Sequence, residues 1–313
     1  MKMADGAEPL LEPGGISVLE RELRVDTPAF LGNAIQRAQW RTPPLKALLR
    51  QWWRVRHAAA CDYDAKVLQS EESRRFGTAG DKGESRQSTV RLRLKNWDHG
   101  GLEKFQERAG RVGTDKQAVD PRLYTGYGPV MNNRELGAQI ATIPVNPEGR
   151  KESRYAIQDG VPRNTLWLRL PAAYETEIAE TLTLVDWFGT FGNRSRNGWG
   201  SLVVGDTQTR ADLVAGHSVL GQVLRPVADC LDGTKGCDWP HAIGTDDAGP
   251  LVWHVRHPSN GKPFRRYEDA LKAVTQLRKD ARQAAGLPKG KRFGDGHLLS
   301  YPVTGHEVSA WSR

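Results

Sequence analysis

The order of the periodic segments constrains the fold of this chain more than any other feature. Apolar and charged residues alternate in residues 16–31, 88–97 and 164–170, and this period of two predicts half-exposed strands. The first of these strands is expected to break near Thr27, which precedes a proline. A further short strand is predicted for SLVVG at residues 201–205.

Two helices are predicted between these strands. Thr42 is a suitable N-cap, Pro43 fits the first helical position, and residues 45–57 contain neither Gly nor Pro. The second helix is expected at 172–188, where acidic residues come early and interact favourably with the helix dipole. With one additional strand in its middle, this order is close to the βαββαβ arrangement of a ferredoxin-like α+β domain.

Residues 206–313 carry weaker patterns that predict a second, smaller α+β domain. A strand is expected near 251–256, a helix at 267–285 and another strand at 298–304. Two segments of the first domain are expected to be mobile loops, at residues 77–88 and 143–153. The predicted organisation is a flexible N-terminus, a first domain and a second domain that is smaller or incomplete: residues 1–15, 16–205 and 206–313.

The charge distribution favours an acidic partner. The 313 residues have a formal net charge of +8 and a sequence pI near 9.5. No Asp or Glu occurs from Thr27 to Cys61, and this window holds a series of cations: Arg37, Arg41, Lys46, Arg50, Arg54 and Arg56. A nucleic acid is therefore the leading candidate partner, ahead of an anionic membrane surface.

The sequence is typical of a cytoplasmic protein without membrane contact. No apolar stretch approaches the roughly 20 residues that cross a bilayer, and the first residues do not form a secretory signal. Three cysteines, Cys61, Cys230 and Cys237, are too few for a disulfide framework in a chain of this length.

The sequence RTPPLKALLRQWWR at residues 41–54 combines cations and tryptophans without an acidic residue. At helical spacing, one stripe contains Leu45, Leu48, Leu49 and Trp52, and we expect it to face the sheet. A separate stripe contains Lys46, Arg50, Trp53, Arg54 and His57. This second stripe is either a solvated charged face or a surface on which Trp53 stacks on a base while its neighbours bind phosphate.

The sequence GTFGNRSRNGWG at residues 189–200 is a second candidate for anion binding. Its glycines can bring the backbone close to a ligand, and Arg194 and Arg196 supply guanidinium groups suited to phosphate. The loop lacks the Gly-Lys-Ser/Thr ending of a Walker A motif, and it leads into a strand, unlike a dinucleotide-binding fingerprint. The alternative interpretation is a tight turn between a helix and a strand.

Several segments of residues 16–205 resemble, in order, the RAMP superfamily of CRISPR effector proteins: TPAFLG, RTPPLKALLRQWWR, EESRRFGTAG, SRQSTVRLRL, YTGYGPV, TLWLRLP and FGNRSRNGWGSL. Within that superfamily they are most similar to the first subunits of type III-B Cmr complexes. The pairing of a basic double-tryptophan helix with a Gly-Arg loop is the most specific part of the resemblance, which is weak beyond residue 206.

The resemblance implies tandem ferredoxin-like domains, related to RNA-recognition folds, in a ribonucleoprotein that holds a guide RNA and captures target RNA in antiviral defence. Its implied partners are CRISPR guide RNA, target RNA or both, and other Cmr-type effector subunits. Because base pairing with the guide reads the sequence, the protein needs only to bind the backbone and stack on bases. By position, the resemblance assigns RNA contact to residues of the helix and the loop: Arg41, Lys46, Arg50, Trp53, Arg54, Gly192, Asn193, Arg194, Ser195, Arg196, Gly198 and Trp199.

The sequence favours a non-catalytic role. RAMP subunits that cut target RNA resemble one another in having an Asp in the loop after the first strand, but no acid lies between Asp26 and Asp62, and Asp26 is expected within the strand. Guide-processing relatives often use a His near the first helix, where His57 is the candidate and has no partner evident from the sequence. The alternatives are a RAMP endoribonuclease, which would process guide RNA or cleave target RNA, and a structural scaffold subunit.

No metal and no other cofactor is expected. The residues His217, Cys230, Cys237 and His241 lack the close pair that is typical of zinc-binding motifs. Unliganded thiols and surface histidines are therefore the favoured interpretation of these residues.

Overall fold

The computed structural model describes residues 14–79, 85–107, 109–114, 118–144, 149–160, 163–205, 218–231, 241–252 and 256–284. The chain forms two compact units, and each is built from two separate parts of the sequence. The first unit contains Met1–Phe105 and Ile140–His254, and the second contains Gln106–Gln139 and Val255–Arg313. This division does not coincide with the predicted domains, 16–205 and 206–313.

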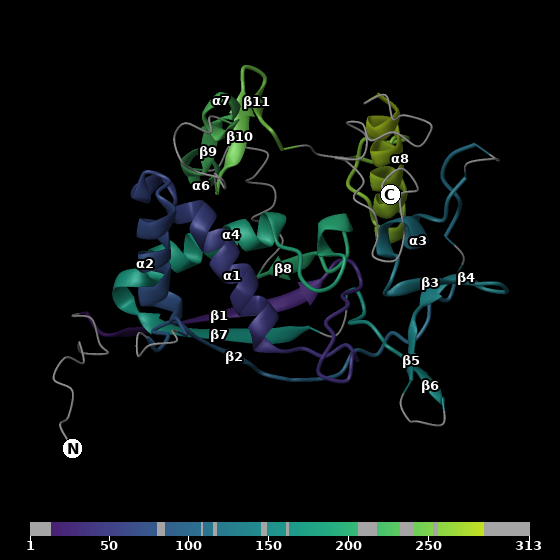
Figure 1. The fold of residues 1–313 in the computed structure, drawn as a ribbon, viewed down its shortest axis with the longest axis horizontal. Coiled ribbons are helices and arrows are strands. Elements are labelled where there is room, and N and C mark those ends of the chain that lie inside the picture. Colours follow the sequence, from purple (N-terminus) through teal and green to yellow (C-terminus); the bar gives the residue numbers. More distant parts are fainter. Residues whose placement is uncertain are drawn as a thin grey trace, which may run out of the picture. The chain divides into compact units, whose positions relative to one another are not determined.

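A four-stranded antiparallel sheet with two helices on one face forms the centre of the first unit (Figure 1). Its strands follow the spatial order β2-β7-β1-β8, where β1 is Ile16–Val25, β2 is Arg91–Leu94, β7 is Asn164–Pro171 and β8 is Leu202–Val204. The helices are α1, Thr42–His57, and α4, Glu175–Phe188, which follows a 3-10 turn at Ala172–Tyr174. In chain order these elements run β1-α1-β2-β7-α4-β8, so the ferredoxin-like α+β arrangement predicted from the sequence is confirmed for this layer.

The alternation of apolar and polar residues decides which face of the sheet the helices cover. In β1, Leu19, Leu23 and Val25 are buried, and the residues between them are half-buried or exposed. Leu19 is the register partner of Leu168 on β7, which is also buried. These side chains pack with apolar residues of α1 and α4 into one hydrophobic core.

The N-terminus of α1 differs by one residue from the sequence prediction. Thr42, the predicted N-cap, is the first helical residue, and Arg41 in extended conformation is the N-cap. The prediction is wrong because it relied on capping by the Thr42 side chain, whereas no side chain caps this end. Pro43 fits the first turn, as predicted, because its missing N–H would have no partner there.

A second helix, which the sequence analysis does not predict, lies between α1 and β2. After a 3-10 turn at Ala59–Cys61, α2 spans Ala65–Phe76. The Asp64 carboxylate caps α2 by accepting hydrogen bonds from two backbone N–H groups. Two of the buried residues of α2 are charged, Glu72 and Arg75, so hydrophobic periodicity does not reveal this helix.

Two smaller sheets also belong to the first unit. β5, Thr142–Pro144, pairs with β6, Lys151–Ser153, so the prediction of a loop at 143–153 is wrong at both ends of that segment. The second small sheet has the order β11-β10-β9, with β9 at Leu224–Pro226, β10 at Ile243–Asp246 and β11 at Gly249–Pro250. Two short helices lie next to β9 in the chain: α6, Ser218–Gln222, and α7, Val227–Leu231. Val219 and Leu220 of α6 pack with Leu184 of α4, which places this region in the first unit.

The second unit packs a short helix against a long one. These are α3, Pro121–Gly126, and α8, Tyr267–Ala284, and α8 confirms the predicted helix at 267–285. Arg122 of α3 is buried, and its Nη2 donates to Glu268 of α8 at 2.9 Å. A two-stranded sheet follows α3 and consists of β3, Val130–Asn133, and β4, Gly137–Ile140. The α3–α8 contact explains why this unit joins two distant parts of the sequence.

Some predicted elements lie outside the described residues. These are the strand at 298–304, residues 1–13 of the N-terminal segment, residues 80–84 of the loop expected at 77–88, and residues 253–255 of the strand expected near 251–256. At its described residues, 251, 252 and 256, that strand prediction is wrong, since β11 ends at Pro250. Within the part of the chain that the structure describes, no helix is long and apolar enough to cross a membrane.

Candidate nucleic-acid interface

The loop at 189–200 and the N-terminus of α1 are both anchored on residues 28–32, directly after β1. Three hydrogen bonds make this connection: Gly200 N to Pro28 O (3.0 Å), Asn193 N to Phe30 O (3.0 Å) and Arg41 Nη2 to Gly32 O (2.6 Å). The fold therefore brings the two elements that the sequence singled out together at one end of the sheet.

Two glycines of the loop are required by its own packing. The φ angles of Gly192 and Gly200 are 89° and 67°, in the region that favours glycine. A Cβ on Gly200 would lie 2.1 Å from Phe191 O, and a Cβ on Gly192 would lie 2.9 Å from Phe30 O. A tight turn therefore explains why these two positions are glycine. It does not explain the arginines between them.

Trp199 is fully buried, so the prediction that it contacts RNA is wrong. Its ring centroid lies 5.0 Å from that of Phe30 and 6.0 Å from that of Phe105. The side chain holds the loop against the body of the unit by apolar burial. The pattern of glycines and arginines around it could not indicate this role, because Phe30 and Phe105 come from distant parts of the chain.

Trp53 is also fully buried, so its predicted role in base stacking is wrong. Its Nε1 donates to the Glu177 carboxylate of α4, and its ring stacks on His57 at 4.6 Å. The prediction of an exposed Trp53 is wrong because it assumed that only the sheet covers α1. In the structure α2 and α4 also pack against this helix. Trp52, which was predicted to be core, is half-buried and stacks on Phe188 at 5.2 Å.

Arg50 and Arg54 converge on one buried carboxylate, that of Glu72 on α2. Arg50 Nε donates to Glu72 Oε1 at 2.5 Å, and Arg54 Nε donates to Glu72 Oε2 at 2.8 Å. The Glu72 side chain is 6% exposed, whereas the two arginines remain 34% and 33% exposed. These cations therefore have a structural partner and still reach the surface. No local sequence pattern indicates this pairing, because α2 is not predicted.

Glu72→Gln is expected to remove an acid-sensitive contribution to stability. Burial alone would raise the pKa of Glu72, but hydrogen bonds from Arg54 and Arg50 outweigh it and lower the pKa below the ordinary value of 4.5. The pair therefore stabilises the fold above that value, and this stabilisation is lost as the pH falls through the lowered pKa. We expect the free energy of unfolding to fall by roughly 1–2 kcal/mol at pH 7. This is less than the loss expected for a fully buried pair, because both arginines are partly exposed.

Urea denaturation of Glu72→Gln and the parent from about pH 7 down to pH 3 measures this contribution. The stability difference between the two proteins should shrink as the pH falls. The exposed residue Glu20 provides a control, because Glu20→Gln should leave the pH dependence of the parent unchanged. A difference that stays constant down to pH 3 would contradict the assignment.

Two buried guanidinium nitrogens at the loop and helix end have no hydrogen-bond acceptor within the described part of the chain. They are Arg41 Nε and Arg194 Nε. An unpaired buried donor of a charged group is costly. The two side chains are half-buried as a whole, so a phosphate could contact the exposed part of each of them. Arg194 also adopts a left-handed backbone conformation, with φ of 60°, next to the turn at Ser195–Asn197.

The other predicted loop residues form the outer rim of this turn. Asn193 and Arg196 are exposed, and Ser195 and Gly198 are half-buried. The Asn193 carboxamide oxygen accepts a hydrogen bond from the backbone N–H of Arg194 and so holds the turn. These residues are placed where a ligand could reach them, and their contact with RNA stays a prediction.

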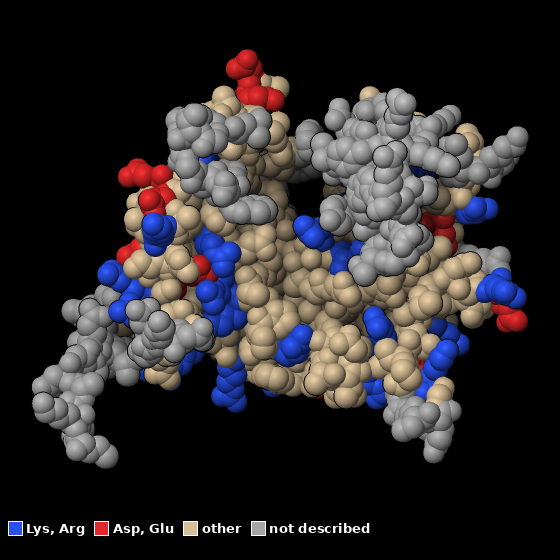
Figure 2. Space-filling view, viewed as in Figure 1, with Lys and Arg blue, Asp and Glu red and all other residues tan. Residues whose placement is uncertain are grey.

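Lysine and arginine side chains gather over α1 on the face shown in Figure 2. The first turn of α1 contains no acidic residue. Burial lowers the pKa of Lys46, and the neighbouring Arg50 lowers it further. Like charges one helical turn apart repel each other, and a bound anion would relieve this repulsion.

No family model and no curated protein matches the sequence. One similar solved structure is Cmr1 from Pyrococcus furiosus in its apo form, with 14% identity, a TM-score of 0.37, and coverage of 89% of this chain and 79% of that chain. A chain of a type IV-B CRISPR complex is similar with 13% identity, a TM-score of 0.33, and coverage of 61% and 92%. Because both TM-scores are below 0.5, the fold assignment rests on the strand order of the chain itself.

His57 has a carboxylate neighbour that the sequence did not reveal. Its Nδ1 lies 3.7 Å from Glu177 Oε2, and its ring stacks on Trp53. Burial lowers the pKa of His57, although Glu177 opposes this effect. Because its pKa lies below the ordinary value of 6.5, the imidazole is neutral near pH 7. The side chain is 18% exposed and is therefore partly accessible.

The cysteine and histidine residues considered for a metal are only partly described. His217 and Cys237 lie outside the described residues, and Cys230 Sγ lies 3.9 Å from the carbonyl oxygen of Arg225 as a weak donor. In the described ranges no group of three His, Cys, Asp or Glu residues is placed to hold a metal ion.

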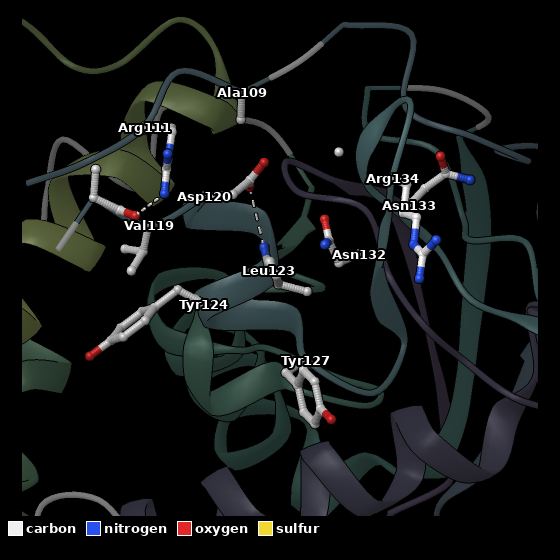
Figure 3. Close-up of a pocket in the computed structure, with 12 residues that line it drawn as sticks. Ala109, Arg111, Val119, Asp120, Leu123, Tyr124, Tyr127, Asn132, Asn133 and Arg134 are labelled. Atoms are coloured by element: carbon white, nitrogen blue, oxygen red, sulfur yellow. Dashed lines mark hydrogen bonds between the residues drawn. The ribbon is translucent and has the colours of Figure 1, made fainter. Parts of the chain in front are cut away.

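The second unit contains a separate pocket of about 680 Å³ between α3 and β3 (Figure 3). Two charged residues at its α3 side already have intramolecular partners. Arg111 donates to the carbonyl of Ala118, and Asp120 accepts hydrogen bonds from the first N–H groups of α3. The remaining polar side chains that line it include Asn132 and Arg134. The pocket therefore lacks the concentration of basic groups found at the loop and α1.

Proposed function

We propose that this chain is a non-catalytic RNA-binding subunit of a type III, Cmr-type CRISPR effector complex. The observation that carries the proposal is the meeting of the Gly-Arg loop with the N-terminus of α1, which places the half-buried Arg41 and Arg194 and the exposed Arg196 at the same end of the sheet. The guide RNA, the target RNA or both would supply the phosphate oxygens. The other partners in this proposal are Cmr-type effector subunits, in the cytoplasm.

The proposed contact is to the RNA backbone and is independent of sequence. Trp53 and Trp199 are buried and cannot stack on bases here, so the interface would act through guanidinium groups and backbone dipoles. Arg50 and Arg54 would add long-range attraction from their partly exposed positions beside Glu72. Such binding weakens steeply as the salt concentration rises.

Arg194→Gln combined with Arg196→Gln is expected to weaken the binding of unrelated single-stranded RNAs alike. The loss should be roughly tenfold or more, because charge-assisted hydrogen bonds to phosphate are removed. The slope of log K against log salt should fall by about 0.7 for each lost contact on a single strand. Fluorescence anisotropy with labelled 20-nucleotide RNAs at several salt concentrations measures both quantities.

A matched control loses the same charge elsewhere on the first unit. Arg74 and Arg150 are 56% and 72% exposed and pair with Glu71 and Glu152. Arg74→Gln combined with Arg150→Gln should bind RNA nearly as the parent does. If the loop variant and this control bind alike, the loop is not the RNA site and the proposal fails.

An endoribonuclease is the second candidate function, and the position of His57 beside Glu177 favours it. A neutral imidazole with a carboxylate neighbour could take a proton from a ribose 2′-hydroxyl. Incubation of the parent and His57→Ala with labelled guide-precursor and target RNAs distinguishes the two functions. Cleavage that disappears in His57→Ala would overturn the non-catalytic proposal, whereas intact RNA with both proteins would support it.

A further inference from the structure

The face of the four-stranded sheet opposite the helices carries a second basic surface. On β2 and β7, Leu94, Leu166 and Leu168 are buried in the core under the helices. The residues that alternate with them point to the other face, where they form a set that we name the sheet-face patch: Arg91, Arg93, Lys95, Trp167 and Arg169. Figure 1 shows α1 and α4 on one side of this sheet and no described helix of the unit on the other.

Two arginines of the patch stand directly opposite each other on neighbouring strands. Arg91 of β2 and Arg169 of β7 are register partners, and both are exposed. Like charges at such positions repel and destabilise the sheet. In the described ranges neither guanidinium forms an ion pair, so an external anion is the group that would neutralise them. Lys95 extends the same row, since its backbone N–H donates to Thr165 O at 2.9 Å.

The patch also presents an aromatic ring among these cations. Trp167 is half-buried, and the guanidinium carbon of Arg93, its register partner, lies 5.7 Å from the ring centroid. An aromatic side chain surrounded by cations on an open sheet is suited to stack on a base while the cations bind the adjacent phosphates.

The acidic groups of this face lie on β1, at one side of the patch. Glu20 is the register partner of Trp167, and Glu22 forms an ion pair with Arg163 at 2.7 Å. An anionic strand would therefore follow β2 and β7 and avoid β1. A purely protective role, in which charges on an edge strand prevent sheet pairing, would explain Arg91 and Arg93. It does not explain Arg169, because β7 is an interior strand.

We propose that the sheet-face patch is a second binding surface for single-stranded RNA, with Trp167 stacking on a base and Arg91 and Arg169 binding the flanking phosphates. The proposal rests on the proposed function, namely that the chain binds RNA. It adds a site on the opposite face of the sheet from the helices. Together the two sites would hold two parts of one strand, or the guide and the target separately.

The test uses the full chain and a labelled 20-nucleotide single-stranded RNA of mixed sequence. Arg91→Gln combined with Arg169→Gln should raise the Kd by about tenfold at low salt and reduce the salt slope by about 1.4. Because this change also removes a like-charge pair, the melting temperature should stay the same or rise. Trp167→Leu should weaken binding by about tenfold, whereas Trp167→Phe should retain most of it. Ultraviolet crosslinking should join the RNA to a peptide that contains residues 164–171.

The outcomes separate this proposal from the proposed function. If Arg91→Gln/Arg169→Gln binds RNA as the Arg74→Gln/Arg150→Gln control does, while Arg194→Gln/Arg196→Gln binds weakly, the sheet site is overturned and the loop site stands. The reverse pattern supports the sheet site and overturns the loop site. If the sheet variant keeps RNA binding but loses binding to poly-glutamate, the face belongs to an acidic protein partner, and the RNA proposal fails there.

Discussion

Trp53→Ala is expected to lower the free energy of unfolding by about 3–5 kcal/mol, because truncating a fully buried aromatic residue leaves a cavity that its neighbours fill only in part. The Trp53 side chain has no exposed surface and packs against Phe76 of α2. Its Nε1 also donates to Glu177, so the truncation removes a hydrogen bond across the α1–α4 contact. Urea denaturation at pH 7, followed by far-ultraviolet circular dichroism, measures the change.

The neighbouring tryptophan is the control for this prediction. Trp52 is half-buried and stacks on Phe188, so Trp52→Ala should cost clearly less than Trp53→Ala. A Trp53→Ala protein as stable as the parent, but unable to bind RNA, would contradict the core position and restore the stacking role predicted from the sequence.

Glu177→Gln is expected to destabilise the first unit by about 2–4 kcal/mol, because it leaves a buried guanidinium without its main counter-charge. Glu177 accepts hydrogen bonds from Arg75 Nε at 2.8 Å and from Arg75 Nη2 at 3.1 Å. The Arg75 side chain is 9% exposed and lies over the Tyr174 ring, 4.5 Å from its centroid. Its other carboxylate partner is Glu71, on the same helix.

A double-mutant cycle with Arg75→Met tests the pair directly. The two substitutions together should cost less than the sum of their separate effects, because removing both charges leaves neither of them unpaired. Glu180→Gln is a matched control on α4, since Glu180 pairs with the more exposed Arg56 at 2.6 Å. Additive losses in the cycle, or equal losses for Glu177→Gln and Glu180→Gln, would contradict the role of this pair.

The strands of the central sheet were predictable because a strand with one buried face alternates apolar and polar residues along its own sequence. Alternating leucines in residues 164–170 indicate a strand with one covered face, and the structure places β7 at that segment. α2 was not predictable in this way, because the residues that it buries include Glu72 and Arg75. Charged residues on a buried face are stable only through partners from other elements, and periodicity does not detect such partners.

The candidate site was predictable as a pair of elements but not in its details. The absence of acidic residues around α1 and the arginines of the loop indicated both elements, and residues 28–32 hold them together. The roles of Trp53 and Trp199 were predicted wrongly, because whether an aromatic residue stacks on a ligand or fills the core depends on distant neighbours. The alternation of Arg91, Arg93 and Lys95 was visible in the sequence, but its meaning depended on Arg169 standing opposite Arg91.

By itself, the sequence determined the order of the central strands and of α1 and α4, the basic character of α1 and the composition of the 189–200 loop. These properties are local, since they follow from residue spacing and charge along a short segment. Only the tertiary structure decided which cations are paired and which tryptophans are buried. Glu72 holds Arg50 and Arg54, whereas Arg41 Nε and Arg194 Nε are left without an acceptor in the described part of the chain. The physical reason is that the pairing of a charge and the burial of a ring depend on the residues around them. The fold brings these residues together from distant positions in the sequence.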